Sequence, residues 1–415
     1  MLKTDITLLN RKTNEKDWVY HMKDIWKESL DFKKKINKKK IWIAIGIVVL
    51  ILINIAIMIV YSVNDTAHDW IDVNIFRKEV RQDKATTSDL KENQDSSIYA
   101  FNKYIGVLSK AKLSIYSNTG SEEKNLDVQI SDPLWDSANR FLAIAENKGQ
   151  KLYVITDKDL SWEASVDGNI SQVHINKNGY VAVVISDTSY KTVIKMYDSQ
   201  GKPLFNTYLS TTRAVDVSIS NDNKYLSIAE VDTSGTMIQS SIRIMSIDKA
   251  SKNETDTLEN TFKCPENKLI TNIKYQDKNR LVCMYTDSIH ELVDGKDETL
   301  IENVNRKVTF QSVNLHNNIC SIEEKSSGLF TADSLINIVN TDNKQTKQYT
   351  AESVTKELFT YGNIIAVNLG TEVEFVNTDG RLVKRYVANQ EITNIVVSDS
   401  IAGIIYRDKI EIINL

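Results

Sequence analysis

The chain has 415 residues, of which 41% are hydrophobic and 8% aromatic, so it can form one large folded domain or two ordinary ones and is not intrinsically disordered. Its net charge of −4 is unevenly distributed: residues 1–40 hold twelve Lys/Arg and six Asp/Glu, a local charge of +6, which leaves −10 on the rest. An acidic remainder excludes a domain that binds nucleic acid through a basic face, so we expect no nucleic-acid partner.

The first 40 residues predict a basic cytoplasmic tail. Apolar residues recur there at helical spacing, which is typical of an amphipathic helix on a membrane surface or against a cytosolic partner. A solvated tail that is only transiently helical explains the pattern equally well. The recurring residues are Trp18, Met22, Ile25, Trp26 and Leu30.

Residues 41–61 predict a single transmembrane helix. The segment contains no charged residue, and 21 residues at 1.5 Å each span about 30 Å, the thickness of a bilayer core. Trp42 and Tyr61 stand at its ends, where amphipathic rings favour the headgroup region. A cleaved signal peptide is the alternative, but the run is too long, begins too late and lacks a small-x-small cleavage site.

Six lysines directly before this segment predict its orientation. Ammonium groups are costly to translocate and are attracted to anionic lipids of the inner leaflet, so the N-terminus should be cytoplasmic and the C-terminal domain outside. We therefore expect a single-pass protein of the cell membrane with the lipid bilayer as one partner. The lysines are Lys33, Lys34, Lys35, Lys38, Lys39 and Lys40.

The residues after the helix predict an all-β domain. We assign 62–95 to a juxtamembrane linker and 96–415 to the domain, which consists of runs of five to eight residues rich in Ile, Val, Tyr and Thr between turn signals. The tight turns often carry a glycine, as at Gly120, Gly201, Gly295 and Gly380, because glycine supplies the positive φ that such hairpins need.

Internal repetition identifies the architecture as a β-propeller. The segment from Ser97 aligns without gaps to the segment from Asn394, and the same cadence of strands recurs between them at roughly 37 to 55 residues, the length of a four-stranded blade. Units begin near residues 97, 134, 171, 215, 271, 309, 355 and 392, which gives eight blades, although irregularity near 309 leaves seven open. A pair of β-sandwiches is the rival architecture, but it would show two unrelated strand sets.

The last unit ends after three strands, so the ring needs a fourth strand from elsewhere. An open ring would expose a strand edge that invites aggregation. We therefore predict that a strand upstream of Ser96 completes the eighth blade, with residues 70–76 as the candidate.

Several stretches resemble a family of uncharacterised single-pass membrane proteins of Gram-positive bacteria. The resemblance is carried by residues 72–80, 101–109, 168–186, 189–198, 220–240, 368–380 and 401–412. It implies a short basic tail and an extracytoplasmic domain similar to WD40 and quinoprotein propellers. It implies no function, because fold alone does not determine function.

Sequence motifs for chemistry are absent. The three cysteines form no C-x-x-C pair, and Cys283 and Cys320 lie in apolar runs typical of buried thiols. Whether Cys264, Cys283 and Cys320 form any disulfide stays open. His174 falls in an inner-strand position, where a structural role is expected, and no histidine belongs to a metal-binding motif. We therefore expect no catalytic residue, metal or cofactor site that local spacing reveals.

Two functions are compatible with this sequence. The first is a membrane-anchored binding or scaffold module for an envelope protein or a cell-wall polymer, with long rim loops that expose Met237 and Phe330. The alternative is an enzyme whose pocket lies in the central channel and acts on an envelope glycan or a small molecule. The oligomeric state is left open.

Overall fold

The computed structural model describes residues 38–63, 71, 86–89, 96–186, 189–265, 268–276, 280–293, 296–303, 306–328 and 331–415. The chain divides into two compact units, Met1–His68 and Asp69–Leu415.

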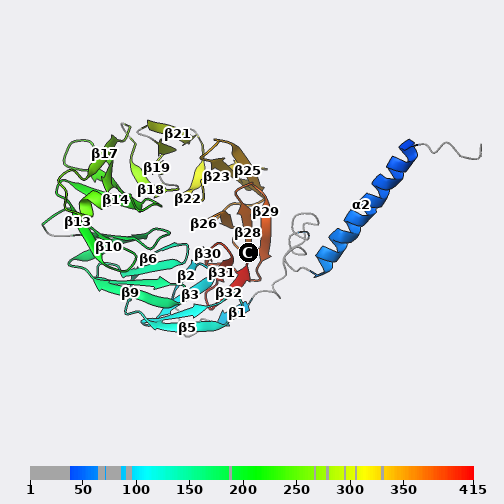
Figure 1. The fold of residues 1–415 in the computed structure, drawn as a ribbon, viewed down its shortest axis with the longest axis horizontal. Coiled ribbons are helices and arrows are strands. Elements are labelled where there is room, and N and C mark those ends of the chain that lie inside the picture. Colours follow the sequence, from blue (N-terminus) through cyan, green and yellow to red (C-terminus); the bar gives the residue numbers. More distant parts are fainter. Residues whose placement is uncertain are drawn as a thin grey trace, which may run out of the picture. The chain divides into compact units, whose positions relative to one another are not determined.

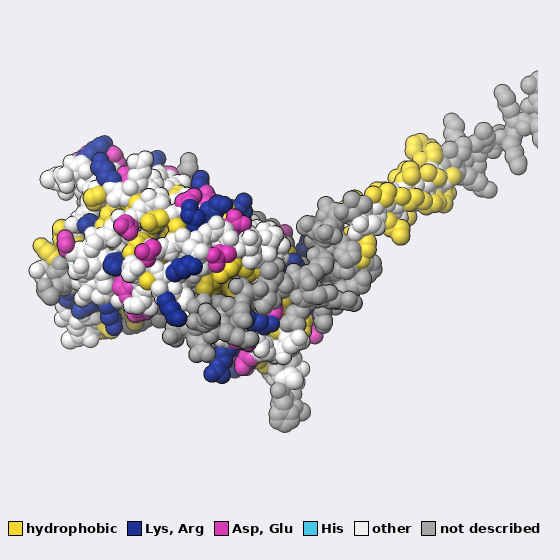
Figure 2. All heavy atoms as spheres, turned by 90° about the horizontal axis from the view of Figure 1, so that it is seen from below, with side chains coloured by type: hydrophobic (Ala, Val, Ile, Leu, Met, Phe, Trp, Pro, Cys, Tyr) yellow, Lys and Arg dark blue, Asp and Glu magenta, His cyan; other side chains and the backbone are white. Residues whose placement is uncertain are grey.

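The first unit contains one long helix, α2 (Lys38–Val63). Its segment Trp42–Ser62 has a mean hydropathy of 3.2, so the helix is long and apolar enough to cross a membrane. Apolar side chains cover its surface (Figure 2). Of the predicted orientation residues, Lys39 and Trp42 are exposed and Tyr61 is half-buried, whereas Lys33, Lys34 and Lys35 lie outside the described residues.

The second unit is an eight-bladed β-propeller, as the repeat predicts (Figure 1). Each blade is a four-stranded antiparallel sheet, and the blades start within a few residues of the predicted units. The alternative architectures, a seven-bladed propeller and a pair of β-sandwiches, are therefore wrong. The irregular unit near 309 is a complete blade whose register shifts twice along its first strand pair.

The first four blades follow the chain, and in each the first strand is innermost. Blade 1 comprises β2 (Ser97–Phe101), β3 (Tyr104–Ser109), β4 (Lys112–Tyr116) and β5 (Glu122–Asp127). Blade 2 comprises β6 (Pro133–Ala138), β7 (Phe141–Glu146), β8 (Lys151–Thr156) and β9 (Asp159–Ser165). Blade 3 comprises β10 (Asn169–Ile175), β11 (Val181–Ser186), β12 (Thr192–Tyr197) and β13 (Pro203–Leu209). Blade 4 comprises β14 (Thr212–Ile219), β15 (Tyr225–Asp232), β16 (Gln239–Ser246) and β17 (Leu258–Lys263), with the short helix α4 (Ile247–Ser251) before its last strand.

The next three blades repeat this order. Blade 5 comprises β18 (Ile270–Tyr275), β19 (Leu281–Tyr285), β20 (Ser288–Val293) and β21 (Lys296–Glu302). Blade 6 comprises β22 (Val308–Leu315), β23 (Asn318–Ser326), β24 (Ala332–Asn340) and β25 (Thr346–Ala351). Blade 7 comprises β26 (Glu357–Tyr361), β27 (Ile364–Asn368), β28 (Glu372–Asn377) and β29 (Leu382–Val387).

Blade 8 joins the two ends of the domain. Its strands β30 (Asn394–Val397), β31 (Ile401–Ile405) and β32 (Lys409–Asn414) come from the C-terminal end, and its fourth strand is β1 (Thr86–Asp89). β1 pairs antiparallel with β32, with Thr86 opposite Ile412 and Asp89 opposite Lys409. The prediction of a closing strand upstream of Ser96 is thus confirmed. Its placement at 70–76 was wrong, because the apolar alternation there was read as a strand while the actual strand is the polar run TTSD.

The core lies between neighbouring blades. A cluster of buried apolar side chains fills each of the eight interfaces among the described residues, including the one between the last and first blades. In that last cluster Ile105 and Val107 of blade 1 pack against Val396, Ile401 and Ile410 of blade 8. The middle strands of the blades, such as β3, β7 and β11, are buried at nearly every position because each sheet packs both faces against its neighbours.

The turn glycines behave as predicted where the structure describes them. Gly120, Gly201 and Gly380 have φ values of 73°, 79° and 74°, respectively. At Gly380 an added Cβ would lie 2.8 Å from the carbonyl oxygen of Gln348, so a side chain there would meet backbone as well as strain. Gly295 lies outside the described residues.

Candidate functional site

Aspartates on the innermost strands connect neighbouring blades. Asp136 of β6 accepts a hydrogen bond from the backbone N–H of Ile175 in blade 3 at 2.8 Å, and Asp216 of β14 accepts one from Ile273 in blade 5 at 2.7 Å. The second oxygen of each carboxylate accepts from the following residue of its own strand. Both carboxylates are therefore committed to backbone donors and hold the ends of the innermost strands together.

Hydrogen bonds link four neighbouring blades on one side of the channel. The hydroxyl of Tyr361 in blade 7 accepts from the backbone N–H of Asn139 in blade 2 at 2.8 Å. The carbonyl of Asn139 in turn accepts from the N–H of Asn102 in blade 1, and the carbonyl of Asn102 accepts from the hydroxyl of Ser398 in blade 8. Blades 7, 8, 1 and 2 are thus linked at the end of the channel where the innermost strands finish.

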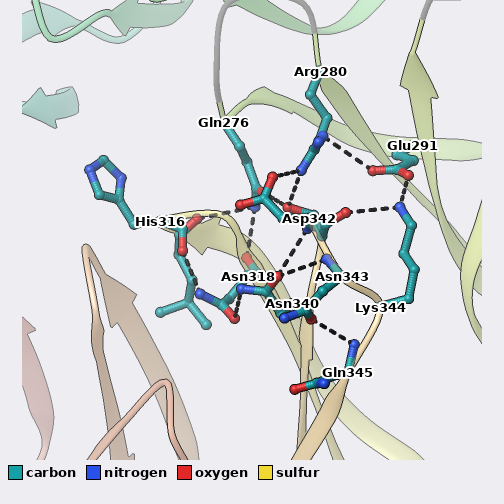
Figure 3. A network of polar contacts seen from close by, with 12 residues as sticks. Gln276, Arg280, Glu291, His316, Asn318, Asn340, Asp342, Asn343, Lys344 and Gln345 are labelled. Atoms are coloured by element: carbon teal, nitrogen blue, oxygen red, sulfur yellow. Dashed lines mark hydrogen bonds and ion pairs between the residues drawn. The ribbon is translucent and has the colours of Figure 1, made fainter.

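A polar network fixes the opposite side, between blades 5 and 6 (Figure 3). The side-chain amide of Gln276, buried at the end of β18, donates to the carbonyls of Val313, Leu315 and Asn318 at 2.7 to 3.2 Å. Beyond it, Glu291 is 2% exposed and lies between Arg280 and Lys344. In Figure 3 the ring of His316 points away from this network.

These contacts surround a pocket of about 570 Å³ in the central channel. It is lined by the last residues of the innermost strands and the turns after them, from blades 2 to 8, and its size is within the usual range for small-molecule sites. Its walls combine apolar side chains such as Trp135 and Phe359 with polar ones. The charged or ionisable side chains in the lining, Tyr included, are Tyr275 together with Asp136, His174, Lys177, Lys274, His316, Tyr361 and Asp399.

Burial shifts the pKa of several acids around the pocket. Desolvation raises the pKa of Asp216, although His174, whose Nε2 lies 3.3 Å from the carboxylate, and the N–H of Ile273 act in the opposite direction. Burial also raises the pKa of Asp399, and the nearby His316 lowers it. Burial likewise raises the pKa of the Tyr361 phenol, so this group stays protonated at neutral pH.

A group of exposed apolar side chains lies on the other face, where the innermost strands begin. Met237 and Ile238, in the β15–β16 loop of blade 4, are 58% and 53% exposed. Tyr208 and Tyr190 of blade 3 are 50% and 37% exposed, and their rings are 4.7 Å apart. Lys191, next to Tyr190, donates to the carbonyl of Thr211, and the following residue Thr212 pairs with Asp232 at the base of the blade 4 loop, so the two loops lie on the same rim. We call these four apolar residues the rim patch.

The predicted rim residues are thus only partly described. Met237 is in an exposed loop, as expected, and whether it binds a partner stays a prediction. Phe330 lies outside the described residues, although β23 and β24, the strands on either side of it, form the equivalent hairpin of blade 6. Tyr190 and Tyr208 were missed, because nothing in the sequence places an outer-strand tyrosine beside a loop of the next blade.

Blade 5 contains a serine–histidine–aspartate chain that local spacing did not reveal. The hydroxyl of Ser288 lies 2.9 Å from Nε2 of His290, and Nδ1 of the same ring lies 2.9 Å from Asp297. Ser288 is fully buried and also bonds the ammonium of Lys268 at 2.8 Å. The chain has the order of a catalytic triad, but a nucleophile without access to substrate cannot act, so we interpret it as a buried structural network.

The remaining candidates for chemistry are structural. Cys264, Cys283 and Cys320 are free thiols, and Cys283 and Cys320 are buried as predicted. Burial raises the pKa of both buried thiols, which disfavours their reactive thiolate form. Among the described residues, no three His, Cys, Asp or Glu side chains gather as a metal site.

Comparisons with known proteins agree with the fold. BamB from Moraxella catarrhalis is 13% identical with a TM-score of 0.48, and the match covers 80% of this chain and 100% of that one. Sqt1 from Chaetomium thermophilum is 10% identical with a TM-score of 0.50, covering 78% and 98%. The β-propeller domain of Cps50 (Swd1) from Myceliophteria thermophila is 12% identical with a TM-score of 0.43, covering 80% and 100%. At such identities the likeness concerns the fold alone.

Sequence comparison gives a family but no relative of known activity. The sequence model of the family DUF5711, which is described as a family of unknown function, matches residues 77–415. No curated protein matches the chain.

Proposed function

Because the chain belongs to DUF5711, a family of unknown function, we propose a function from its own structure: a membrane-anchored module that binds an envelope protein through the rim patch of blades 3 and 4. The observation that carries this proposal is the exposure of Met237 and Ile238 beside the tyrosine pair. Large apolar side chains grouped on a surface are typical of protein interfaces, where aromatic residues and Met are enriched. A cell-wall polymer is the other partner class that the rim could serve.

The surface chemistry fits a protein partner better than a charged polymer. On the side of the propeller that Figure 2 shows, Lys/Arg and Asp/Glu side chains are interspersed and form no broad basic field. Charges mixed in this way give little attraction for a polyanion. The rim patch offers instead Met237 and Ile238, whose burial would stabilise a complex by about 1.5 to 3 kcal/mol for each side chain that is fully buried.

We expect charges in the rim patch to prevent partner capture. In the full-length tagged protein, the double change Met237→Glu and Ile238→Glu should lower the yield of the partner crosslinked from intact membranes at least tenfold. The reason is that two carboxylates would have to be desolvated in the interface. Quantitative mass spectrometry after crosslinking measures the yield.

Leu160→Glu is the matched control, because Leu160 is an apolar residue, 38% exposed, on the outer strand of blade 2. It should leave the captured protein unchanged. Equal capture by all three proteins would contradict the rim as the binding surface, and release of glycan fragments in place of a protein would favour a cell-wall polymer.

The anchor and its orientation are part of the proposal. The helix Lys38–Val63 has the length and hydropathy of a span, and the lysine run before and at its start favours a cytoplasmic N-terminus. Each lysine near an anionic leaflet contributes roughly 1 kcal/mol to this preference. The propeller then lies outside the membrane.

Labelling of introduced cysteines tests that orientation. In intact cells a membrane-impermeant maleimide should label Lys202→Cys, whose side chain is exposed on blade 3, and should label Thr4→Cys only after the membrane is permeabilised. The parent protein is the blank, since two of its thiols are buried and the third is partly buried. The reverse labelling pattern would place the propeller in the cytoplasm.

The channel pocket favours a second candidate function, an enzyme acting on an envelope glycan or a small molecule. Its lining brings together His174, His316, Asp136 and Asp399 from four blades. The hydroxyls in the lining do not support nucleophilic catalysis, however. Those of Ser137 and Ser218 bond backbone groups, and that of Thr360 bonds another hydroxyl, so none of them contacts a base. We therefore favour binding over catalysis.

A further inference from the structure

The charged side chains of the channel pocket fall into two groups. Asp136 and the His174–Asp216 pair are hydrogen-bonded to the protein. In contrast, Lys177, Lys274, His316 and Asp399 line the pocket, and no hydrogen bond or ion pair holds their side chains among the described residues. Lys274 and His316 act on Asp216 and Asp399, respectively, only through longer-range attraction. Charged groups that no hydrogen bond in the protein satisfies are suited to a ligand that supplies the opposite charges.

The two kinds of charge lie on different sides of the ring. Lys177 belongs to the turn after β10 in blade 3, and Lys274 to β18 in blade 5, so the two ammonium groups flank blade 4. Asp399 follows β30 in blade 8, which is diametrically opposite blade 4 in a ring of eight. The wall beside Asp399 is held by the bond from the Asn139 N–H to the hydroxyl of Tyr361, and the wall beside Lys274 by the Gln276 network. Both ends of the pocket are therefore fixed by interactions that do not need a ligand.

The carboxylates near the two lysines, those of Asp136 and Asp216, are already hydrogen-bonded within the protein. The carboxylate of Asp136 receives two backbone N–H donors, and that of Asp216 receives two and lies 3.3 Å from Nε2 of His174, so both are already held by the protein. The charged groups that blades 3 and 5 leave available to a ligand are therefore the two ammonium groups. Asp399 is the carboxylate in the lining that keeps both oxygens available for a donor.

We infer that the channel pocket binds a small zwitterion, with its carboxylate held by Lys177 and Lys274 and its ammonium group held by Asp399: a short unmodified peptide. The apolar walls at Trp135 and Phe359 suit the aliphatic atoms between the two charged ends. A chain of two to four residues has an extended length of about 7 to 14 Å, which brackets the diameter of roughly 10 Å that a sphere of 570 Å³ has. This site is on the face opposite the rim patch and does not depend on the rim partner.

Alanine peptides of two, three and four residues test the inference with the full-length protein in phospholipid nanodiscs. Isothermal titration calorimetry should show saturable binding, with one length preferred. N-acetylation or C-amidation of the preferred peptide should each weaken binding at least tenfold, because each removes one of the two charges. If no alanine peptide binds at millimolar concentration, or if both blocked forms bind as well as the free peptide, the inference is wrong.

Variants of the pocket residues then test which side chains hold the carboxylate and which holds the ammonium group of the peptide. The double change Lys177→Gln and Lys274→Gln should weaken binding of the free peptide at least tenfold and abolish the penalty for C-amidation. Asp399→Asn should abolish the penalty for N-acetylation instead. Lys202→Gln, an exposed lysine on blade 3 outside the pocket lining, is the control and should bind as the parent does. Unchanged affinity in the pocket variants would show that the peptide binds elsewhere, and equal melting temperatures for all four proteins confirm that they are folded.

Discussion

Replacing Glu291 by alanine should destabilise the propeller by about 3 to 5 kcal/mol, the usual cost of removing one partner from a buried ion pair. Glu291 is 2% exposed, and its two oxygens face the side chains of Arg280 and Lys344. Without the carboxylate, the two cations would remain close together between blades 5 and 6, and Arg280 would keep its ion pair with the more exposed Asp342. Burial and the charge of Arg280 already lower the pKa of Lys344, so this lysine would be the group that loses its proton.

Urea denaturation followed by tryptophan fluorescence measures this loss in the full-length protein. Glu298→Ala is the matched control, since Glu298 is exposed on β21 of the same blade, and it should stay within about 0.5 kcal/mol of the parent. Glu291→Gln should fall between the two, because the amide oxygen still accepts a hydrogen bond. Indistinguishable midpoints for Glu291→Ala and Glu298→Ala would show that the pair contributes nothing.

Proline in the closing strand should open the ring. In β1, Thr87 is opposite Glu411 and Ser88 is opposite Ile410. Backbone N–H groups of successive strand residues point to opposite sides, so the double change Thr87→Pro and Ser88→Pro must remove a donor that faces β32. We expect the free energy of unfolding to fall by roughly 1 to 3 kcal/mol. Amide exchange in β32 should become at least tenfold faster, because β32 would then be an unpaired edge strand.

Hydrogen exchange with mass spectrometry of the peptide containing residues 409–414 measures the opening. Thr87→Ala with Ser88→Ala keeps every backbone donor and should retain slow exchange. Aggregation of the proline variant on size-exclusion chromatography would accompany an exposed edge. Slow exchange in the proline variant would mean that β1 does not close blade 8.

The repeat was readable from the sequence because each blade must bury two faces with the same short strands. This constraint leaves a spacing of apolar runs that can be counted, and the counted units begin at residue 97 and at seven later positions close to the observed strands. The closing strand was located wrongly for the same reason. Its residues TTSD, 86–89, are polar and lie on an outer position, where apolar alternation is not required.

The channel pocket could not be predicted in this way. Its lining takes between one and five residues from each of seven blades, and these groups are separated by whole repeats in the sequence. The bond between Tyr361 and Asn139 joins residues 222 positions apart, so no local pattern records it. His174 illustrates the limit: its inner-strand position was recognised, but its neighbour Asp216 is in the next blade.

The pairing of β1 with β32 also sets the order in which the molecule can be completed during synthesis. Residues 86–89 leave the ribosome before any blade exists, and their partners, residues 409–412, are made only after the strands of the first seven blades. Joining ends so distant in the chain has a large entropic cost and is slow. Until it happens, seven finished blades are next to an unfinished one whose edge is open. A nascent chain of this protein therefore stays vulnerable to proteases and to pairing with other chains until translation has passed residue 414.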